Sequence, residues 1–227
     1  MRKPIAIGTA AALVAALAAA APAQAHETRN GNNHDYATVT FFNGLTDRTV
    51  DVYIDGKKKF NNVDAGDFEN SLKVRDGDRE IAITKWDARN DRRPIVELDV
   101  DLEDDTDYTV VAHFEKDGDK TATLFENDTD RVRRGDGRLT VRHVAEAGKV
   151  DVRADGDRII KNLKNGDEKV LVLDADEYEV KVTKAGKKRA LIGPEDVDVE
   201  RRTNTIVYAW GDEDNLELAI QSVDLDR

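Results

Sequence analysis

The densest group of carboxylates in the sequence is the heptad DLEDDTD, residues 101–107, which contains Asp101, Glu103, Asp104, Asp105 and Asp107. Clustered carboxylate and carbonyl oxygens are the ligands that Ca²⁺ prefers, so these five residues are candidates for a low-affinity calcium site. Their spacing is not that of a helix–loop–helix calcium loop, which ends on a glutamate at its twelfth position. Aspartate is also common in turns for conformational reasons. We therefore expect no cofactor, with calcium as the alternative.

Two tryptophans are the candidates for ligand binding. Most aromatic residues fall at alternating positions of predicted strands, where they are expected to form the core. Trp86 and Trp210 come instead at the ends of their predicted strands. A ring displayed there could stack against a sugar.

Catalytic signatures are absent from the sequence. It has no Gly-x-Ser-x-Gly elbow, no His-Glu-x-x-His pair and no cysteine. His113 and His143 lie in different repeats, and zinc needs three or four converging ligands, so each is expected to be structural or to lie on a solvated strand face, with an interdomain metal site as the alternative. The sequence predicts a protein that is not an enzyme. A hydrolase with carboxylates that spacing cannot reveal is the remaining alternative.

The segments that must position these residues occur twice, as an internal sequence repeat. VDVYIDG at residues 50–56 returns as VDVRADG at 150–156, and matches at the same interval extend on both sides. Further along the chain the interval shortens, so that residues 109–112 match 206–209. Such slips belong in loops, where insertions cost little. A repeat of this length matches a whole domain, which predicts two tandem domains.

Alternation of apolar and polar residues dominates both repeats, for example in ATVTFF, EIAITKW, RLTVRHV and TIVYAW. Asp-Gly and Asn-Gly turns separate these runs. About seven short strands per repeat predict an all-β protein with two antiparallel β-sandwich domains, immunoglobulin-like or transthyretin-like. Val50, Val52, Val150 and Val152 are expected to face the cores and Asp51 and Asp151 to face out, with one buried and one solvated face per sheet.

The chain begins like an exported protein. Arg2 and Lys3 precede an apolar run that ends in Ala23-Gln24-Ala25, a pattern typical of a cleaved signal peptide. We expect a signal peptide over 1–25, a flexible leader over 26–36, a first sandwich over 37–130, a linker over 131–137 and a second sandwich over 138–227. The expected location is extracellular or at the cell surface, without membrane insertion after cleavage.

The net charge restricts the partners. Removing Arg2 and Lys3 with the signal changes the formal net charge from −12 to −14, and the acidic excess lies almost wholly in the first repeat. Nucleic acid is excluded as a partner for such a surface. A basic protein or a surface glycan remains as the expected partner, and solubility is the simplest reason for the charge.

Several stretches together resemble one known family. VDVYIDG, YTVVAHF followed by LFENDT, VRHVAEAGKVDVRADG, NLKNGDE and NTIVYAWG resemble the bacterial family called domain of unknown function 4397, from about residue 37 to residue 222. The resemblance implies export and a β-sandwich similar to immunoglobulin or transthyretin-like modules, and it implies no activity. The family usually has histidine where this chain has Asn43.

These observations favour a non-catalytic cell-envelope or extracellular binding or structural module. A carbohydrate-binding accessory module that uses Trp86 or Trp210 is the alternative. The remaining alternative is the hydrolase named above. Within EDDTDYTV, residues 103–110, Tyr108 is expected to form a tyrosine corner, which is a structural hydrogen bond of immunoglobulin-like sandwiches.

Overall fold

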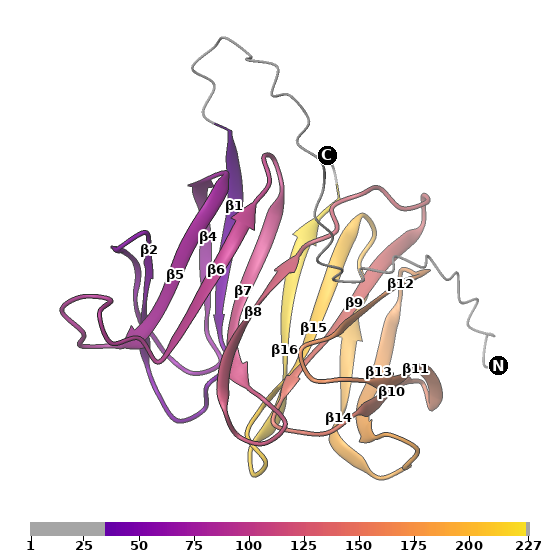
Figure 1. The fold of residues 1–227 in the computed structure, drawn as a ribbon. Coiled ribbons are helices and arrows are strands. Elements are labelled where there is room, and N and C mark those ends of the chain that lie inside the picture. Colours follow the sequence, from indigo (N-terminus) through magenta and orange to yellow (C-terminus); the bar gives the residue numbers. More distant parts are fainter. Residues whose placement is uncertain (1–34, 226–227) are drawn as a thin grey trace, which may run out of the picture.

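The computed structural model describes residues 35–225, which form two β-sandwiches lying side by side (Figure 1). The predicted all-β class and the sandwich architecture are confirmed. The expected signal peptide and most of the expected leader lie outside the described residues. Within the described part of the chain, no helix has the length and apolar character needed to cross a membrane.

The first sandwich pairs a sheet ordered β3-β2-β5-β6 with a sheet ordered β4-β1-β7-β8. Its strands are β1 (Tyr36–Asn43), β2 (Val50–Ile54), β3 (Lys57–Val63), β4 (Phe68–Arg75), β5 (Gly77–Lys85), β6 (Val96–Leu102), β7 (Asp107–Phe114) and β8 (Lys120–Glu126).

The second sandwich repeats this arrangement, with sheets ordered β11-β10-β13-β14 and β12-β9-β15-β16. Its strands are β9 (Asp136–Ala145), β10 (Val150–Ala154), β11 (Asp157–Leu163), β12 (Glu168–Asp174), β13 (Glu177–Lys184), β14 (Ala190–Asp198), β15 (Thr203–Gly211) and β16 (Leu216–Asp224). β9 begins two residues before the expected start of this domain at residue 138.

The strand directions differ from the antiparallel pattern at one place in each sandwich. β1 pairs with β7 in parallel, and β9 pairs with β15 in parallel. The chain passes through the opposite sheet between the two members of each pair, so the second strand can return in the direction of the first. Alternation of residue types does not distinguish these two directions.

The hairpin written in both repeats forms as predicted. Val50 and Val52 lie in the first core, and their counterparts Val150 and Val152 lie in the second. Asp55 and Gly56 connect β2 to β3 with φ of 50° and 72°, the left-handed pair that a two-residue hairpin turn requires. The second repeat makes the same turn with Asp155 at φ 50° and Gly156 at φ 86°.

The expectation that Asp51 and Asp151 face solvent is wrong. Both aspartates are fully buried, and each accepts a hydrogen bond of 2.9 Å from the backbone N–H of Asn62 or Asn162. Those asparagines have left-handed φ values, 57° and 55°, beside a register shift in the hairpin. Lys58 and Arg158 cover the carboxylates. The duplicated aspartate therefore stabilises a β-bulge on the outer face of each sandwich.

The expectation of one solvated face per sheet is also wrong for the two inner sheets. Every residue of β15 is buried, as is every residue of β7 and β9 after the first. The reason is a third core between the sandwiches, in addition to one core inside each. Its buried members are Phe42, Val111, Phe125, Val144, Ile206, Tyr208 and Trp210.

Polar contacts also connect the two sandwiches, in addition to the third core. The Arg138 guanidinium donates to the carbonyls of Asp128 and Asp130 at 3.0 and 2.8 Å, and Asn204 donates to Asp128 O at 3.1 Å. The segment between β8 and β9 is therefore fixed to the second sandwich. Thr46 of the first sandwich donates to the Asp212 carboxylate of the second. The four sheets therefore lie in one stack, joined by these bonds and by the third core.

Candidate functional site

The five acidic residues proposed as calcium ligands do not form a common site. Asp104 accepts the Tyr36 N–H at 3.1 Å, and Asp107 accepts the Asn127 side-chain amide at 2.6 Å. Within residues 35–225, no three carboxylate or histidine side chains converge in a way that could hold a metal ion. Asp101, Glu103 and Asp105 belong to the same strand end and turn, and Asp105 has a left-handed φ of 52°.

The same turn contains the predicted tyrosine corner. The Glu103 N–H donates to the Tyr108 hydroxyl oxygen at 3.2 Å, and Tyr108 is buried. This prediction is confirmed. The acidic segment is therefore the connection from β6 to β7, and two of its carboxylates, those of Asp104 and Asp107, accept bonds from Tyr36 and Asn127.

Trp210 is wrong as a candidate for sugar stacking, because its ring is only 7% exposed. It packs edge-on to Phe42, with ring centroids 5.6 Å apart, in the core between the sandwiches. Gly66 of the first sandwich lies directly against the ring, so that a methyl group added there would lie 3.0 Å from it. Trp210 is a structural residue that joins the two domains.

His113 and His143 are buried near each other where the two sandwiches meet, so that each sandwich contributes one of them. His113 bonds to Phe114 O and to the Thr123 hydroxyl, both at 2.9 Å. The carbonyl can only accept, so the imidazole N–H is on Nδ1. His143 donates from Nε2 to Gly148 O at 2.9 Å. Both side chains have the structural role predicted for them.

The bond made by His143 explains what its position does in the repeat. Asn43 occupies the equivalent position in the first sandwich, and its side-chain amide donates to Arg48 O at 2.9 Å. Arg48 and Gly148 are themselves equivalent at the interval of 100 residues. The same hydrogen bond therefore closes the loop after the first strand in each domain, whether histidine or asparagine makes it.

The buried histidines predict a loss of stability in mild acid. Burial lowers the pKa of His113 to about 4 and also lowers the pKa of His143. The unfolded chain takes up these protons near pH 6.5, whereas the native protein cannot, so the stability is complete above that pH and falls as the pH decreases towards about 4. We expect His113 alone to account for up to about 3 kcal/mol of this loss, measured by urea unfolding at a series of pH values.

The control for that prediction is the double variant His113→Gln with His143→Asn. Asparagine already makes the equivalent bond in the first sandwich, and glutamine keeps hydrogen-bonding capacity beside Thr123. The difference in pH dependence between this variant and the natural chain isolates the histidines from the carboxylates, which titrate lower. Identical pH profiles for the two proteins would contradict the prediction.

Trp86 is the candidate that the structure leaves accessible. It directly follows β5, and 56% of its surface is exposed. The loop that begins with it, residues 86–95, is held to the sheet by hydrogen bonds at Ala88 and at Ile95. The Tyr53 hydroxyl donates to Ala88 O at 2.9 Å, and the Ile95 N–H donates to Ile83 O at 2.7 Å. The ring is thus exposed on an anchored loop.

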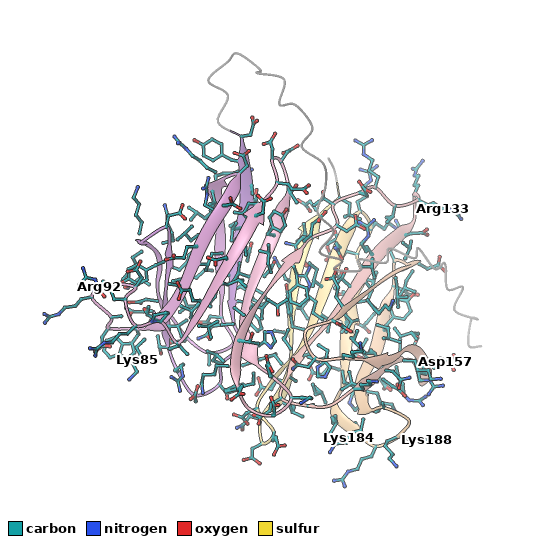
Figure 2. The ribbon with its side chains drawn as sticks, in the orientation of Figure 1. Lys85, Arg92, Arg133, Asp157, Lys184 and Lys188 are labelled. Atoms are coloured by element: carbon teal, nitrogen blue, oxygen red, sulfur yellow. The ribbon has the colours of Figure 1, made fainter. Side chains whose placement is uncertain are left out.

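The surroundings of Trp86 are basic, although the first sandwich as a whole is acidic. Lys85, Arg89, Arg92 and Arg93 are exposed in or beside the loop. Figure 2 shows Lys85 and Arg92 pointing away from the ribbon at this end of the first sandwich. Lys58 of β3 reaches Ala88 O at 3.4 Å, which brings one more ammonium group to the loop. We call Trp86 and these five basic residues the Trp86 face.

Sequence reasoning did not identify the basic part of the Trp86 face. The signal was present in the run KWDARNDRRP, residues 85–94, in which four basic side chains accompany two acidic ones. Averaging the charge over the whole acidic repeat concealed it. Only the folded loop shows that each of these arginines and the ring is exposed.

Comparisons with known proteins give a family and a distant structural likeness. A family model described as "Domain of unknown function (DUF4397)" matches residues 37–153. No curated protein matches the chain. Among solved structures, the crystal structure of CBMbc (family CBM26) from Eubacterium rectale Amy13K in complex with maltoheptaose is similar, with 12% sequence identity and a TM-score of 0.23, over 83% of this chain and 96% of that chain. At that TM-score the likeness assigns no ligand to this chain.

Proposed function

The chain belongs to the family described as "Domain of unknown function (DUF4397)", and from that premise we propose that it is a non-catalytic module that binds an anionic glycan through the Trp86 face. In this proposal the protein works outside the cell, as the export signal expected at its N-terminus suggests. The observation that carries the proposal is the exposure of the Trp86 ring among basic side chains.

The ring supplies the contact to the sugar. The face of an indole carries negative charge density, which attracts the polarised C–H groups on the apolar side of a pyranose. A tryptophan that is 56% exposed on an anchored loop offers such a face without the entropy cost of ordering the loop. Exposed aromatic residues of this kind are common at the centres of binding sites.

The basic side chains define the class of glycan. Guanidinium groups bind carboxylate, sulfate and phosphate in a bidentate geometry, and Arg89, Arg92 and Arg93 place three of them within seven residues of Trp86. The rest of the first sandwich repels polyanions, so that an acidic polymer is directed to this one face. A neutral glycan would use the ring alone.

Binding is favoured over hydrolysis because the buried ionisable side chains have structural roles. Asp51 and Asp151 bond to the backbone of their bulges, and the two histidines bond to backbone carbonyls. Each of these groups therefore already stabilises the fold. A general acid or base would need to direct its proton towards an accessible substrate.

A glycan array followed by calorimetry tests the proposal. Trp86→Ala is expected to lower the binding free energy by about 2 kcal/mol, about thirtyfold in affinity, for every glycan bound. Arg92→Ala is expected to weaken anionic glycans only, and raised salt to do the same, because both act on the charge interaction. Tyr36→Ala removes another exposed ring, 40% exposed, and should leave binding unchanged. Binding that is unaffected by Trp86→Ala would refute the proposal.

A further inference from the structure

The two sandwiches meet through the same pair of elements at two places. The turn between β3 and β4 contacts the end of β15, where Gly66 lies against Trp210. The turn between β11 and β12 contacts the end of β7, where the Asn165 amide donates to Phe114 O at 2.9 Å. The two repeats place Gly66 opposite Gly166 and His113 opposite Trp210 as equivalents. The two contacts can therefore be compared with each other at equivalent positions.

The contact at Trp210 is filled, whereas the contact at His113 is open. A methyl group added to Gly66 would lie 3.0 Å from the indole ring, but one added to Gly166 would meet no atom within 4 Å. The space left there is a cleft of about 410 Å³ between the sandwiches. Its lining residues are His113, Glu115, Lys116, Thr121, Thr123, Ala147, Gly148, Lys149, Lys164, Asn165 and Gly166. We call it the His113 cleft.

The charge of the lining also differs between the two places. The lysines of the His113 cleft, Lys116, Lys149 and Lys164, come from three different loops of the two domains. Their equivalents at the filled contact are Glu213, Thr49 and Asp64. In the strand register His113 pairs with Thr121, whereas Trp210 pairs with Glu217. The side chains around the His113 cleft are therefore basic, whereas those at the equivalent contact around Trp210 are mainly acidic.

The interior of the cleft offers uncharged hydrogen-bonding groups. The Thr123 hydroxyl bonds to the imidazole of His113, which is buried and uncharged at neutral pH because burial lowers its pKa to about 4. Thr121 lies on the same strand as Thr123, β8. Asn165 uses both hydrogens of its amide for Phe114 O and Ala145 O. Both bonds are donated by the amide nitrogen, and neither involves the amide oxygen of Asn165. Glu115 is the one carboxylate in the lining, and Lys116 also pairs with Asp117 at 3.1 Å.

We propose that the His113 cleft is a second binding site, for a small polar molecule that carries a carboxylate or phosphate group. Its volume lies within the range of small-molecule sites, about 300–1,000 Å³. The three ammonium groups hold the oxyanion, and the threonine hydroxyls bond to the rest of the molecule. Because both domains contribute, the site exists only in the docked stack. It is separate from the Trp86 face and does not depend on the glycan proposal.

An NMR titration of the chain with inorganic phosphate, and in parallel with glucuronate, tests this inference. We expect saturable amide shifts at the loops of Lys116, Lys149 and Lys164, and none at the equivalent loops of Glu213, Thr49 and Asp64. Preference for one probe identifies the oxyanion. If both probes leave these three loops unshifted at millimolar concentration, or shift both contacts alike, the site is overturned.

Two variants introduce, into the His113 cleft, the residues found at the equivalent positions of the Trp210 contact. The triple change Lys116→Glu, Lys149→Thr and Lys164→Asp introduces the equivalents at exposed positions, where folding is not at risk, and each lost ammonium contact should weaken binding about tenfold. His113→Trp should fill the cleft and abolish the shifts. The matched control Lys187→Ala with Lys188→Ala removes exposed charges elsewhere and should change nothing. Unaltered binding in the triple variant would overturn the proposal even if His113→Trp fails to fold.

Discussion

Replacing Trp210 with alanine is expected to lower the free energy of unfolding by about 3–5 kcal/mol, the range for a large aromatic side chain removed from a core. The ring contacts Phe42 and lies over Gly66, so its loss leaves a cavity in the core between the sandwiches. Its indole N–H has no partner among the described residues, and thus no hydrogen bond is lost with it. Urea unfolding monitored by circular dichroism measures the change.

The same variant should uncouple the two domains. The third core makes the sandwiches unfold together, so we expect a single transition for the natural chain and two transitions for Trp210→Ala. Trp86→Ala is the matched control, because it removes the same side chain from an exposed site and should change stability by less than about 0.5 kcal/mol. Equal effects of the two tryptophan substitutions would show that the third core contributes little.

Replacing Arg142 with alanine is expected to cost about 3–5 kcal/mol, because it leaves a buried polar network without its cation. Arg142 is fully buried in β9. Its guanidinium donates to Glu168 at 2.8 Å, to the Tyr208 hydroxyl at 2.6 Å and to Glu126 O of the first sandwich at 3.1 Å. It also lies over the Phe125 ring, 4.4 Å from the centroid. One side chain thus links both domains.

Two further variants show whether geometry or charge accounts for this cost. Arg142→Lys keeps the charge but cannot make three directed bonds from a planar group, so it should not restore the stability. Arg134→Ala removes an exposed arginine shortly before β9 and should change the stability by less than about 0.5 kcal/mol. Full stability of Arg142→Lys in urea unfolding would contradict the bonding role assigned to the guanidinium.

Local rules accounted for much of the fold. The left-handed turn at Asp55-Gly56 and the inward position of Val50 and Val52 follow from residue type and a period of two, and both depend only on neighbouring residues. The Tyr108 corner was equally local, because its partner Glu103 lies five residues away. The burial of Asp51 could not be predicted in this way. Its partners Lys58 and Asn62 reach it across a register shift in the hairpin, and the alternation of residue types does not reveal such a shift.

The sequence by itself determined the all-β class, the duplication and the expected export of this protein, because alternation, turn chemistry and a signal pattern are properties of short segments. Only the tertiary structure decided which surfaces remain free. Trp86 and Trp210 have the same place at the end of a strand, but docking of the sandwiches buries one and leaves the other exposed. The physical reason is that burial depends on what packs against a face, which residue spacing along one strand does not contain. The cleft at His113 arises in the same way, from a contact between loops about fifty residues apart.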